Sequence, residues 1–351
     1  MPWYTPTEQH SFFARLPKVD LHRHLEGSLR LDTILDIARK HSLTVPVRPT
    51  LARLVQVQPE ENLTFANFLS KFQTLHLLYR SPEILNRITG EAVEDAAADG
   101  VAHLELHVTP TALGRTQSFP LGQVINWVVE GAYAAGLRTG ISVRLVISIN
   151  RHEPAALAET VADLAAQNSH RGVVGLDLAG DEARFPAEPF LPIFRAAKQA
   201  GLRISIHAGE WGGAEHVRQA IEDFEADRVA HGVRVLEDER ITALARERQT
   251  AFDVCVTANT QSGVVADLPA HPAARMIAAG LNVTFNTDDP SISQITLTDE
   301  YRLACEQLGL SRPALAERIR AAARAAFLPQ PAIQRLLERI QPGLAELEAA
   351  P

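Results

Sequence analysis

The chain of 351 residues is 46% hydrophobic and 22% charged, and it carries a formal net charge of −8. These values are typical of globular proteins and exclude disordered, collagen-like and coiled-coil classes. The acidic balance argues against a nucleic acid or an anionic membrane surface as partner, since either would need clustered lysine and arginine. Two cysteines, no export signal and no apolar run of about 18 residues predict a cytoplasmic protein without a disulfide framework or membrane span.

Short apolar runs rich in β-branched residues predict eight strands. In chain order they are Val19–His22, Val101–Val108, Ile141–Ile149, Val173–Leu178, Arg203–His207, Arg228–His231, Ala251–Val256 and Asn282–Asn286. Amphipathic segments between most of them predict helices over Leu121–Ala135, Pro154–Gln167, Phe190–Ala200, Ala214–Phe224, Asp238–Arg248 and Pro272–Ala279. This alternation predicts an α/β fold, a (β/α)8 TIM barrel, and we expect residues 1–351 to form one domain. A doubly wound sheet is the alternative, but the glycine-rich phosphate turn that it needs is missing.

Two segments are longer than the alternation of one strand and one helix requires. Residues 25–100 predict a helical insertion after the first strand, and residues 298–351 predict a C-terminal helical extension. The clearest helices in them are Leu31–Lys40, Asn62–Tyr79, Pro82–Asp99, Ser311–Phe327 and Pro331–Ala349. Phe65, Phe68 and Phe72 share one helical face. We favour packing of this face against the barrel core, and a lid over a pocket is the alternative.

Catalytic residues of a TIM barrel lie at the carboxyl ends of its strands. Those ends here collect imidazoles and carboxylates, namely His22, His24, His207, Glu210, His231, Asp288 and Asp289. His22 and His24 lie two residues apart on one strand and therefore face the same side. With His207 and Asp288 they form a His3Asp set typical of a zinc or iron site. We predict one metal ion per chain, because no bridging carboxylate or carboxylated lysine for a second ion is apparent.

The other groups predict chemistry around that metal. Glu210 lies just beyond its strand, where a carboxyl in a desolvated pocket holds a proton near neutral pH and donates it. An N-cap or first-turn acid of the following helix is the alternative. His231 is either a fourth ligand or a base that orients metal-bound water, and we favour the second. Adjacent carboxylates repel, so we expect one of Asp288 and Asp289 to bind the ion and the other to reach the ligand.

Three further residues, His103, Glu105 and His107, alternate along the second strand and share a face. If that face is the barrel interior, we expect them to support the site by hydrogen bonds. No nucleophile elbow, P-loop or suitably placed cysteine is present, and Cys255 is interpreted as a core residue.

Five segments together resemble the motifs of the adenosine/adenine deaminase family of metal-dependent amidohydrolases. They are Pro17–Ser28 (PKVDLHRHLEGS), Leu176–Glu182 (LDLAGDE), His207–Glu210 (HAGE), His231–Val233 (HGV) and Asn286–Pro290 (NTDDP), in the family's order and spacing. The resemblance implies a (β/α)8 barrel with one zinc ion held by His22, His24, His207 and Asp288. It also implies that Glu210 donates a proton to the purine ring and that His231 orients or deprotonates the zinc-bound water.

The same resemblance implies substrate contacts. Asp289 would meet ring nitrogen 7 or hold the water, the Gly180 N–H would meet ring nitrogen 3, and His24 and Glu26 would contact the substrate. Glu26 stands where adenosine deaminases carry a ribose-binding aspartate, and glutamate there is also common in adenine deaminases. Against adenine, Val-Ala-His-Gly around His231 lacks the acidic residue of base-specific enzymes, and the segment after Asp289 is similar to bacterial nucleoside deaminases.

Two smaller departures from the family pattern are Val256, where proline is usual, and His107, where arginine is commoner. We expect that these two residues could reshape the pocket.

We therefore expect zinc-dependent hydrolysis of adenosine and 2′-deoxyadenosine to inosine-type products and ammonia. Zinc can lower the pKa of bound water to about 7, and the hydroxide would add to C6 once Glu210 protonates ring nitrogen 1. The alternatives are adenine deaminase, 6-amino-deoxyfutalosine deaminase and a catalytically silent purine-binding barrel. The expected partner is a small purine nucleoside, and the expected state is a monomer or homodimer.

Overall fold

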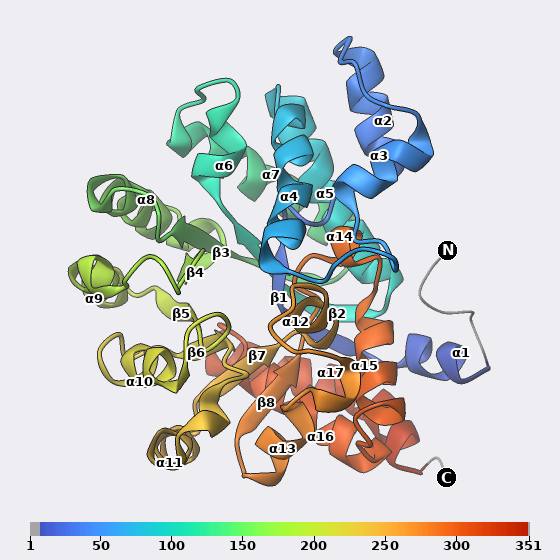
Figure 1. The fold of residues 1–351 in the computed structure, drawn as a ribbon, viewed down its shortest axis with the longest axis vertical. Helices are drawn as coiled ribbons and strands as arrows, with labels where there is room; N and C mark the ends of the chain where they lie inside the picture. The colour runs from blue at the N-terminus through green and yellow to red at the C-terminus, as the bar shows by residue number, and fades with distance from the viewer. Residues whose placement is uncertain (1–7, 350–351) are drawn as a thin grey trace.

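A parallel eight-stranded barrel is the centre of the computed structural model, which describes residues 8–349 (Figure 1). The strands are β1 Lys18–His24, β2 Val101–Val108, β3 Ser142–Asn150, β4 Val173–Ala179, β5 Arg203–Ala208, β6 Arg228–His231, β7 Ala251–Val254 and β8 Asn282–Phe285. Each strand pairs in parallel with the next along the chain. The predicted (β/α)8 fold is therefore confirmed.

The barrel closes between β1 and the segment after β8, at the carboxyl ends of both. The His24 N–H donates to the Asp288 carbonyl, and the Asp288 N–H donates to the His22 carbonyl, each at 2.8 Å. The Leu21 N–H donates to the Asn286 side chain, also at 2.8 Å. Asp288 has a left-handed φ of 62°, which is uncommon outside glycine. The closure thus fixes the backbone of three predicted metal ligands.

Helices surround the barrel, as Figure 1 shows most clearly for α8 to α11. The helices that alternate with the strands are α5 Pro82–Ala98, α7 Leu121–Thr139, α8 Ala155–Gln167, α9 Leu191–Gln199, α10 Ala214–Glu222, α11 Glu239–Arg248 and α13 Ala273–Ala278. Their predicted positions are confirmed, with shifts at the ends. The largest shift is in α7, which continues to Thr139 because its stop signal is Gly140, in the left-handed region with φ of 74°.

The predicted insertion after β1 is helical. It contains α2 Leu31–Lys40, α3 Arg48–Val55, α4 Phe65–Leu75 and the 3-10 helix η1 His76–Leu78, followed by α5. In Figure 1, α2 and α3 project beyond the barrel. Helix α3 was not predicted, because its eight residues bury only Leu51 and Val55 and give too short a pattern.

The C-terminal extension is also helical, with α15 Leu297–Glu306, α16 Arg312–Ala325 and α17 Gln330–Ala349. Helix α16 contacts β1 and β8, and α17 contacts α16 and β2, so the tail covers the barrel. At the opposite end of the chain, α1 Glu8–Arg15 packs on α15. No helix in the described range 8–349 combines the length and apolar character needed to cross a bilayer.

The predicted seventh strand is too long. It ends at Val254, and Val256 begins the short helix α12 Val256–Gln261. The reason is a distant buried carboxylate: Glu300 of α15 accepts hydrogen bonds from the N–H groups of Val256 and Thr257 at 2.8 and 3.1 Å. Because a carboxylate satisfies the free N–H groups at a helix N-terminus, helix replaces strand there.

Charged residues fill the interior of the barrel toward the amino ends of its strands. The Arg228 guanidinium lies between Glu105 and Asp253, at 2.7 and 2.8 Å, and 3.6 Å above the ring centroid of Phe327. His103 joins this group through Nε2, 3.2 Å from Glu105. The alternating face of β2 is therefore interior, as predicted, although its first two members support Arg228 and not the predicted metal site.

Candidate metal centre and active site

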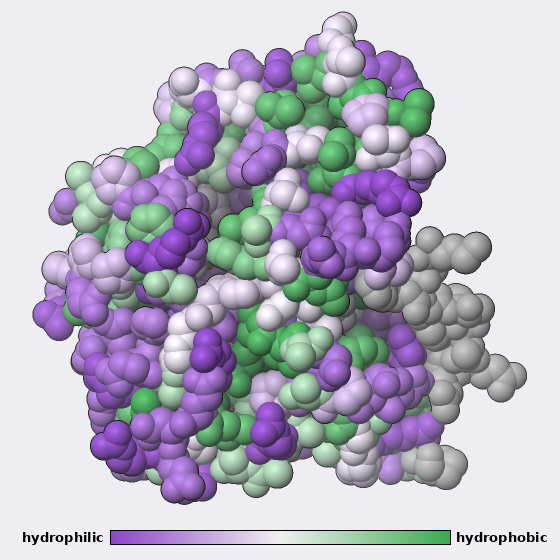
Figure 2. All heavy atoms as spheres, viewed as in Figure 1, coloured by the Kyte–Doolittle hydropathy of each residue, from purple (hydrophilic) through white to green (hydrophobic). Residues whose placement is uncertain are grey.

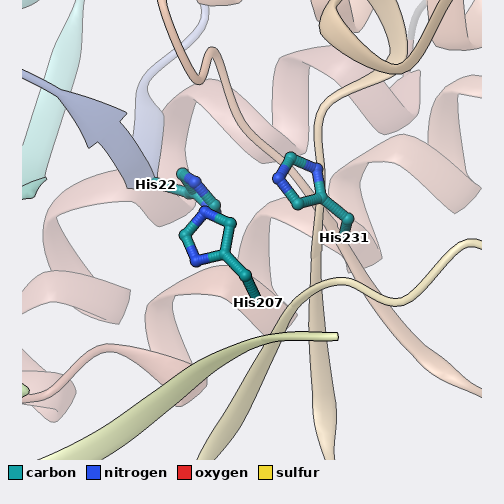
Figure 3. Close-up of side chains that lie close together, drawn as sticks. All are labelled: His22, His207 and His231. Atoms are coloured by element: carbon teal, nitrogen blue, oxygen red, sulfur yellow. The ribbon is translucent and has the colours of Figure 1, made fainter. Parts of the chain in front are cut away.

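The predicted side chains at the strand ends meet in the mouth of the barrel. β1 supplies His22 and His24, β5 supplies His207, β6 ends in His231, and Asp288 follows β8. Figure 3 shows the rings of His22, His207 and His231 gathered from different strands. One nitrogen from each of these three rings lies within 4.8 Å of the other two. The mouth therefore concentrates metal-binding atoms from distant parts of the sequence.

Three donor atoms lie close enough together to share one ion, and two of the three distances between them fit a tetrahedral zinc site. His22 Nε2 and His24 Nε2 are 3.0 Å apart, and each lies 3.5 Å from Asp288 Oδ1. Zinc bonds of about 2.0–2.2 Å imply ligand–ligand edges of about 3.3–3.6 Å in a tetrahedron. Burial lowers the pKa of His24 to about 3, and burial and nearby imidazoles hold that of His22 well below its usual range. Both rings are thus neutral and offer lone pairs.

His207 faces the same point and is oriented from behind by Asp177 of β4. The ring centroids of His207 and His22 are 4.8 Å apart, and His207 Nδ1 lies 3.0 Å from Asp177 Oδ1. A carboxylate only accepts, so Nδ1 carries the proton and Nε2 is the nitrogen left for a metal. Burial opposes the charged imidazole, but Asp177 outweighs it and raises the pKa of His207 to about 9. Metal binding would displace that proton.

Asp177 has two further partners and was not predicted. Its Oδ2 accepts from Ser148 Oγ at 3.1 Å and lies 3.4 Å from His107 Nδ1. Burial disfavours the carboxylate, yet the charges and hydrogen bonds of His207 and His107 hold the pKa of Asp177 well below its usual range. The sequence did contain a signal, namely an aspartate inside an otherwise apolar strand. Burying a carboxylate is costly unless it is paired, so a partner could have been expected.

His107 supports the site, as the strand pattern predicted, but it lies outside the cavity lining. Its ring stacks on that of His22, with centroids 4.7 Å apart and planes 8° apart, and its Nε2 lies 3.3 Å from the Leu21 carbonyl. Neither His107 nor Val256 lines the cavity. An effect of these two departures on the pocket would therefore act through neighbouring residues, and the expectation that they reshape it stays a prediction.

Glu210 is a largely buried carboxyl, with its side chain 14% exposed, beside the histidine cluster. Burial, opposed by the charge of His207 but reinforced by the charges of Asp288 and Glu182, raises the pKa of Glu210 well above its usual range, which favours the protonated carboxyl. Its Oε2 lies 3.7 Å from His231 Nε2. Helix α10 begins at Ala214 with Gly213 as its N-cap, so the alternative in which Glu210 is an N-cap or first-turn acid of this helix is wrong.

The loop that carries Glu210 is fixed by Glu182, which was quoted in a motif but given no role. The Glu182 carboxylate accepts hydrogen bonds from the backbone N–H groups of Gly209, Glu210 and Gly212, at 3.0, 2.6 and 2.7 Å. Consecutive N–H groups that converge in this way form an anion-binding nest. Glu182 is thereby a positioning residue for Glu210.

A cavity of about 580 Å³ opens above the cluster, and α4 forms one side of its mouth. Phe68 belongs to the core and Phe72 packs against it, in agreement with the favoured interpretation, and all three phenylalanines, Phe65 included, also line the cavity. The Phe65 ring lies 4.3 Å from that of Trp211, across the mouth. Figure 2 shows hydrophobic side chains near the middle of this face, inside a largely hydrophilic rim.

Three predicted substrate contacts also line the cavity: Glu26, Gly180 and Asp289. Glu26 Oε1 accepts from the Thr109 N–H at 2.7 Å, and burial raises the pKa of Glu26 to about 7. Glu26 Oε2 and Asp289 Oδ1 are buried without a hydrogen-bond partner in the described part of the chain. Buried polar atoms are normally paired, so these oxygens are suited to a ligand.

Two glycines allow this arrangement. A Cβ on Gly27 would lie 1.8 Å from Asp289 Oδ1, so only glycine leaves room for that carboxyl. Gly180 has φ of 95°, a conformation that other residues rarely adopt, and it places backbone against the cavity. Both glycines were part of the quoted motifs.

Fold and site together define a class: a TIM barrel with a metal-capable histidine and aspartate cluster under a cavity at the carboxyl ends of its strands. Residues 17–342 match the family described as adenosine deaminase. The chain belongs to this adenosine deaminase family.

Curated relatives agree with this assignment. The chain is 37% identical to an adenosine deaminase of Erwinia tasmaniensis over 301 residues, which cover 85% of this chain and 90% of the relative. It is 35% identical to an adenosine deaminase of Serratia proteamaculans over 335 residues, which cover 93% and 99% of the two chains.

Solved structures have the same fold. A zinc-bound amidohydrolase from Burkholderia ambifaria superposes with a TM-score of 0.88 at 26% identity, covering 99% of this chain and 95% of the other. An adenine deaminase from Arthrobacter aurescens superposes with 0.86 at 26% identity, covering 95% and 100%. Arabidopsis ADAL complexed with IMP superposes with 0.83 at 26% identity, covering 96% and 99%.

Proposed function

We propose that this protein hydrolyses adenosine and 2′-deoxyadenosine, releasing ammonia from C6 and giving inosine or 2′-deoxyinosine. The observation that carries the proposal is the placement of Glu210, a carboxyl with a raised pKa, beside the His22, His24, His207 and Asp288 cluster at the base of one cavity. Membership of the adenosine deaminase family over residues 17–342 supports the same reaction.

The proposed cofactor is one zinc ion, held by His22, His24, His207 and Asp288. The donor spacing and the Asp177 carboxylate behind His207 support this ligand set. Three imidazoles and one carboxylate suit zinc better than magnesium or calcium, which prefer oxygen ligands alone. When bound, zinc supplies a nucleophile at neutral pH by lowering the pKa of a water ligand.

Glu210 is the proposed general acid. Its proton, retained at neutral pH by burial, is donated to ring nitrogen 1, which makes C6 electron-poor. General acid–base catalysis of this kind contributes about 10²–10⁴-fold to the rate. His231, with Nε2 3.7 Å from Glu210, orients the attacking oxygen on the same side of the cavity.

The proposed substrate contacts use the unpaired groups of the cavity. Asp289 meets ring nitrogen 7, the Gly180 N–H meets ring nitrogen 3, and Glu26 and His24 contact the sugar side. The buried, unpartnered oxygens of Glu26 and Asp289 support these assignments, because a bound purine nucleoside would supply their missing hydrogen bonds.

The charges at the cavity mouth favour a nucleoside over a nucleotide. Two arginines line the mouth, but each is neutralised by a neighbouring acid: Arg115 lies 3.3 Å from Glu153, and Arg184 pairs with Asp181. A 5′-phosphate would need unpaired cationic or N–H donors. We therefore place a neutral hydroxymethyl group, and not a phosphate, toward this end.

A second candidate is adenine deaminase, favoured by Glu26 in place of the ribose-binding aspartate of adenosine deaminases. The Glu26 side chain is one methylene longer than aspartate, and its carboxyl already accepts a hydrogen bond from the Thr109 N–H. The choice between base and nucleoside therefore depends on Glu26.

Steady-state ammonia release from adenosine, 2′-deoxyadenosine, adenine, AMP and 6-amino-deoxyfutalosine tests the proposal. We expect kcat/KM to be highest for the two nucleosides. A clear preference for adenine, AMP or 6-amino-deoxyfutalosine would overturn the nucleoside assignment, and no ammonia from any of them would indicate a purine-binding barrel without catalysis.

We also propose a cytoplasmic location. Both cysteines, Cys255 and Cys305, are free thiols, which suits a reducing compartment. Fractionation of cells that make the tagged chain would test this, with a periplasmic or secreted product as the contrary result.

A further inference from the structure

We propose that Asn259 and His271 fix the tautomer of His231, so that His231 presents an Nε2–H donor, and not a lone pair, to the reacting groups. Asn259 and His271 are positioning residues in this scheme. The inference deepens the proposed function, since it rests on the placement of His231 beside the substrate, and it decides between the two roles that the sequence left open for this ring.

The chain of hydrogen bonds from Ala273 through His271 and Asn259 to His231, here called the relay, begins at a backbone amide. A backbone N–H can only donate. The Ala273 N–H, at the start of α13, points to His271 Nδ1 at 3.2 Å. His271 Nδ1 must therefore be unprotonated, and in the neutral ring the proton lies on Nε2. Burial lowers the pKa of His271 to about 3, so the ring is neutral at physiological pH.

The next link is the Asn259 amide of α12. His271 Nε2 lies 3.4 Å from Asn259 Oδ1, and Asn259 Nδ2 lies 3.1 Å from His231 Nδ1. Because His271 Nε2 donates, it requires the amide oxygen on its side, and the amide NH2 group is left to face His231. His231 Nδ1 is thereby an acceptor, and the neutral ring carries its proton on Nε2.

Burial keeps this chain of hydrogen bonds intact. Asn259 is fully buried, and His231 and His271 are 1% and 3% exposed. The backbone around them is also fixed: the Val265 N–H donates to the Asn259 carbonyl, and Glu300 caps α12. Reversing the relay would turn two donors toward each other or leave the Ala273 N–H unpaired, and a buried unpaired group costs about 1–3 kcal/mol.

The consequence concerns the chemistry at Nε2, which faces Glu210 across 3.7 Å. A general base would need a lone pair there, and the relay places a proton instead. His231 therefore orients the attacking oxygen by donating a hydrogen bond to it. Its left-handed φ of 63° is the backbone strain that aims the ring at this position.

The direct test is nitrogen NMR of the zinc-loaded protein with 15N-labelled histidine. Long-range proton–nitrogen correlations distinguish protonated from unprotonated ring nitrogens, and His231→Asn identifies the signals of His231. We expect Nε2 protonated and Nδ1 unprotonated at neutral pH. A proton on Nδ1 alone, or on both nitrogens, would overturn the proposal whatever the activity of the protein.

Asn259→Asp supplies the matching perturbation. The carboxylate accepts from both rings, so we expect His231 to gain a proton on Nδ1 in the NMR spectrum. We expect kcat for adenosine to fall about 10²–10⁴-fold, as in other enzymes whose catalytic histidine is in the wrong tautomer, with KM and bound zinc little changed. An Nδ1 that stays unprotonated, or a kcat near that of the parent, contradicts the relay.

Gln261→Glu is the control, because it makes the same amide-to-acid change on α12 at a buried residue that bonds to Ser293 and not to His231. It should leave the His231 signals and kcat near those of the parent. If the proposed role of His231 in deamination is wrong, His231→Ala would leave kcat for adenosine unchanged. The NMR spectrum of the parent protein would still decide the tautomer of His231 in that case.

Discussion

Replacing Asp177 with asparagine tests the proposal that Asp177 prepares His207 to bind a metal. In Asp177→Asn the amide oxygen still accepts from His207 Nδ1, which now lies 3.0 Å from Oδ1. The NH2 group replaces Oδ2, which accepts from Ser148 at 3.1 Å and lies 3.4 Å from His107 Nδ1. The substitution thus removes the buried negative charge and turns an NH2 donor toward Ser148 Oγ and His107 Nδ1.

The expected magnitude follows from the role of such partners. Loss of a carboxylate behind a metal-binding histidine weakens metal affinity or activity by about 10–100-fold. At 1.4 kcal/mol per tenfold, that is about 1.4–2.8 kcal/mol of zinc-binding free energy. We expect the larger end, because both oxygens of Asp177 are used and the residue is fully buried.

Competition between the metal-free protein and a chromogenic chelator measures the zinc Kd. Ser148→Ala is the control, because it removes one neutral hydrogen bond and leaves the Asp177 charge in place. It should weaken zinc binding less than Asp177→Asn does. An unchanged Kd in Asp177→Asn, or an equal loss in both variants, would refute the reasoning that Asp177 prepares His207.

Three further outcomes are expected. Glu210→Gln should keep its zinc and lose about 10²–10⁴-fold in kcat, because the amide cannot donate the ring proton; metal analysis and steady-state rates check this, and a near-normal kcat contradicts it. Phe65→Ala should raise KM for adenosine about 2–10-fold through loss of its contact with Trp211, at 4.3 Å, while an unchanged KM would show that α4 does not close the mouth. Burial lowers the pKa of Lys18 from 10.5 to about 8, so the unfolded state binds more protons than the folded state between these pH values. The free energy of unfolding, measured with urea, should therefore rise with pH across this window. Lys18→Met should remove the rise.

The sequence located the barrel and the groups at its mouth for a physical reason. Parallel strands in a barrel bring their carboxyl ends together, so residues after β1, β5, β6 and β8 meet whatever separates them in the chain. The positions of His22, His207 and Asp288 could therefore be predicted from the strand ends alone, without the register between neighbouring strands.

The supporting residues could not be found in this way. Asp177, Glu182 and Asn259 act on the site through hydrogen bonds to residues 27 to 30 positions away, and these bonds depend on strand register and loop path. The same is true of Glu300, whose carboxylate ends β7 by capping α12 from a distance of 44 residues. The hydrophobic periodicity of a helix or strand indicates which of its faces is buried. It does not indicate which polar group from a distant part of the chain lies against that face.

Stepwise addition of zinc to chelator-stripped protein, with ammonia release from adenosine followed at each step, tests most directly whether the four ligands form a working centre. The rate should rise from near zero in proportion to added zinc and stop rising at one ion per chain, and His22→Ala should abolish the rise. Full activity in the stripped protein, or a plateau at another ratio, would contradict the site described for this barrel.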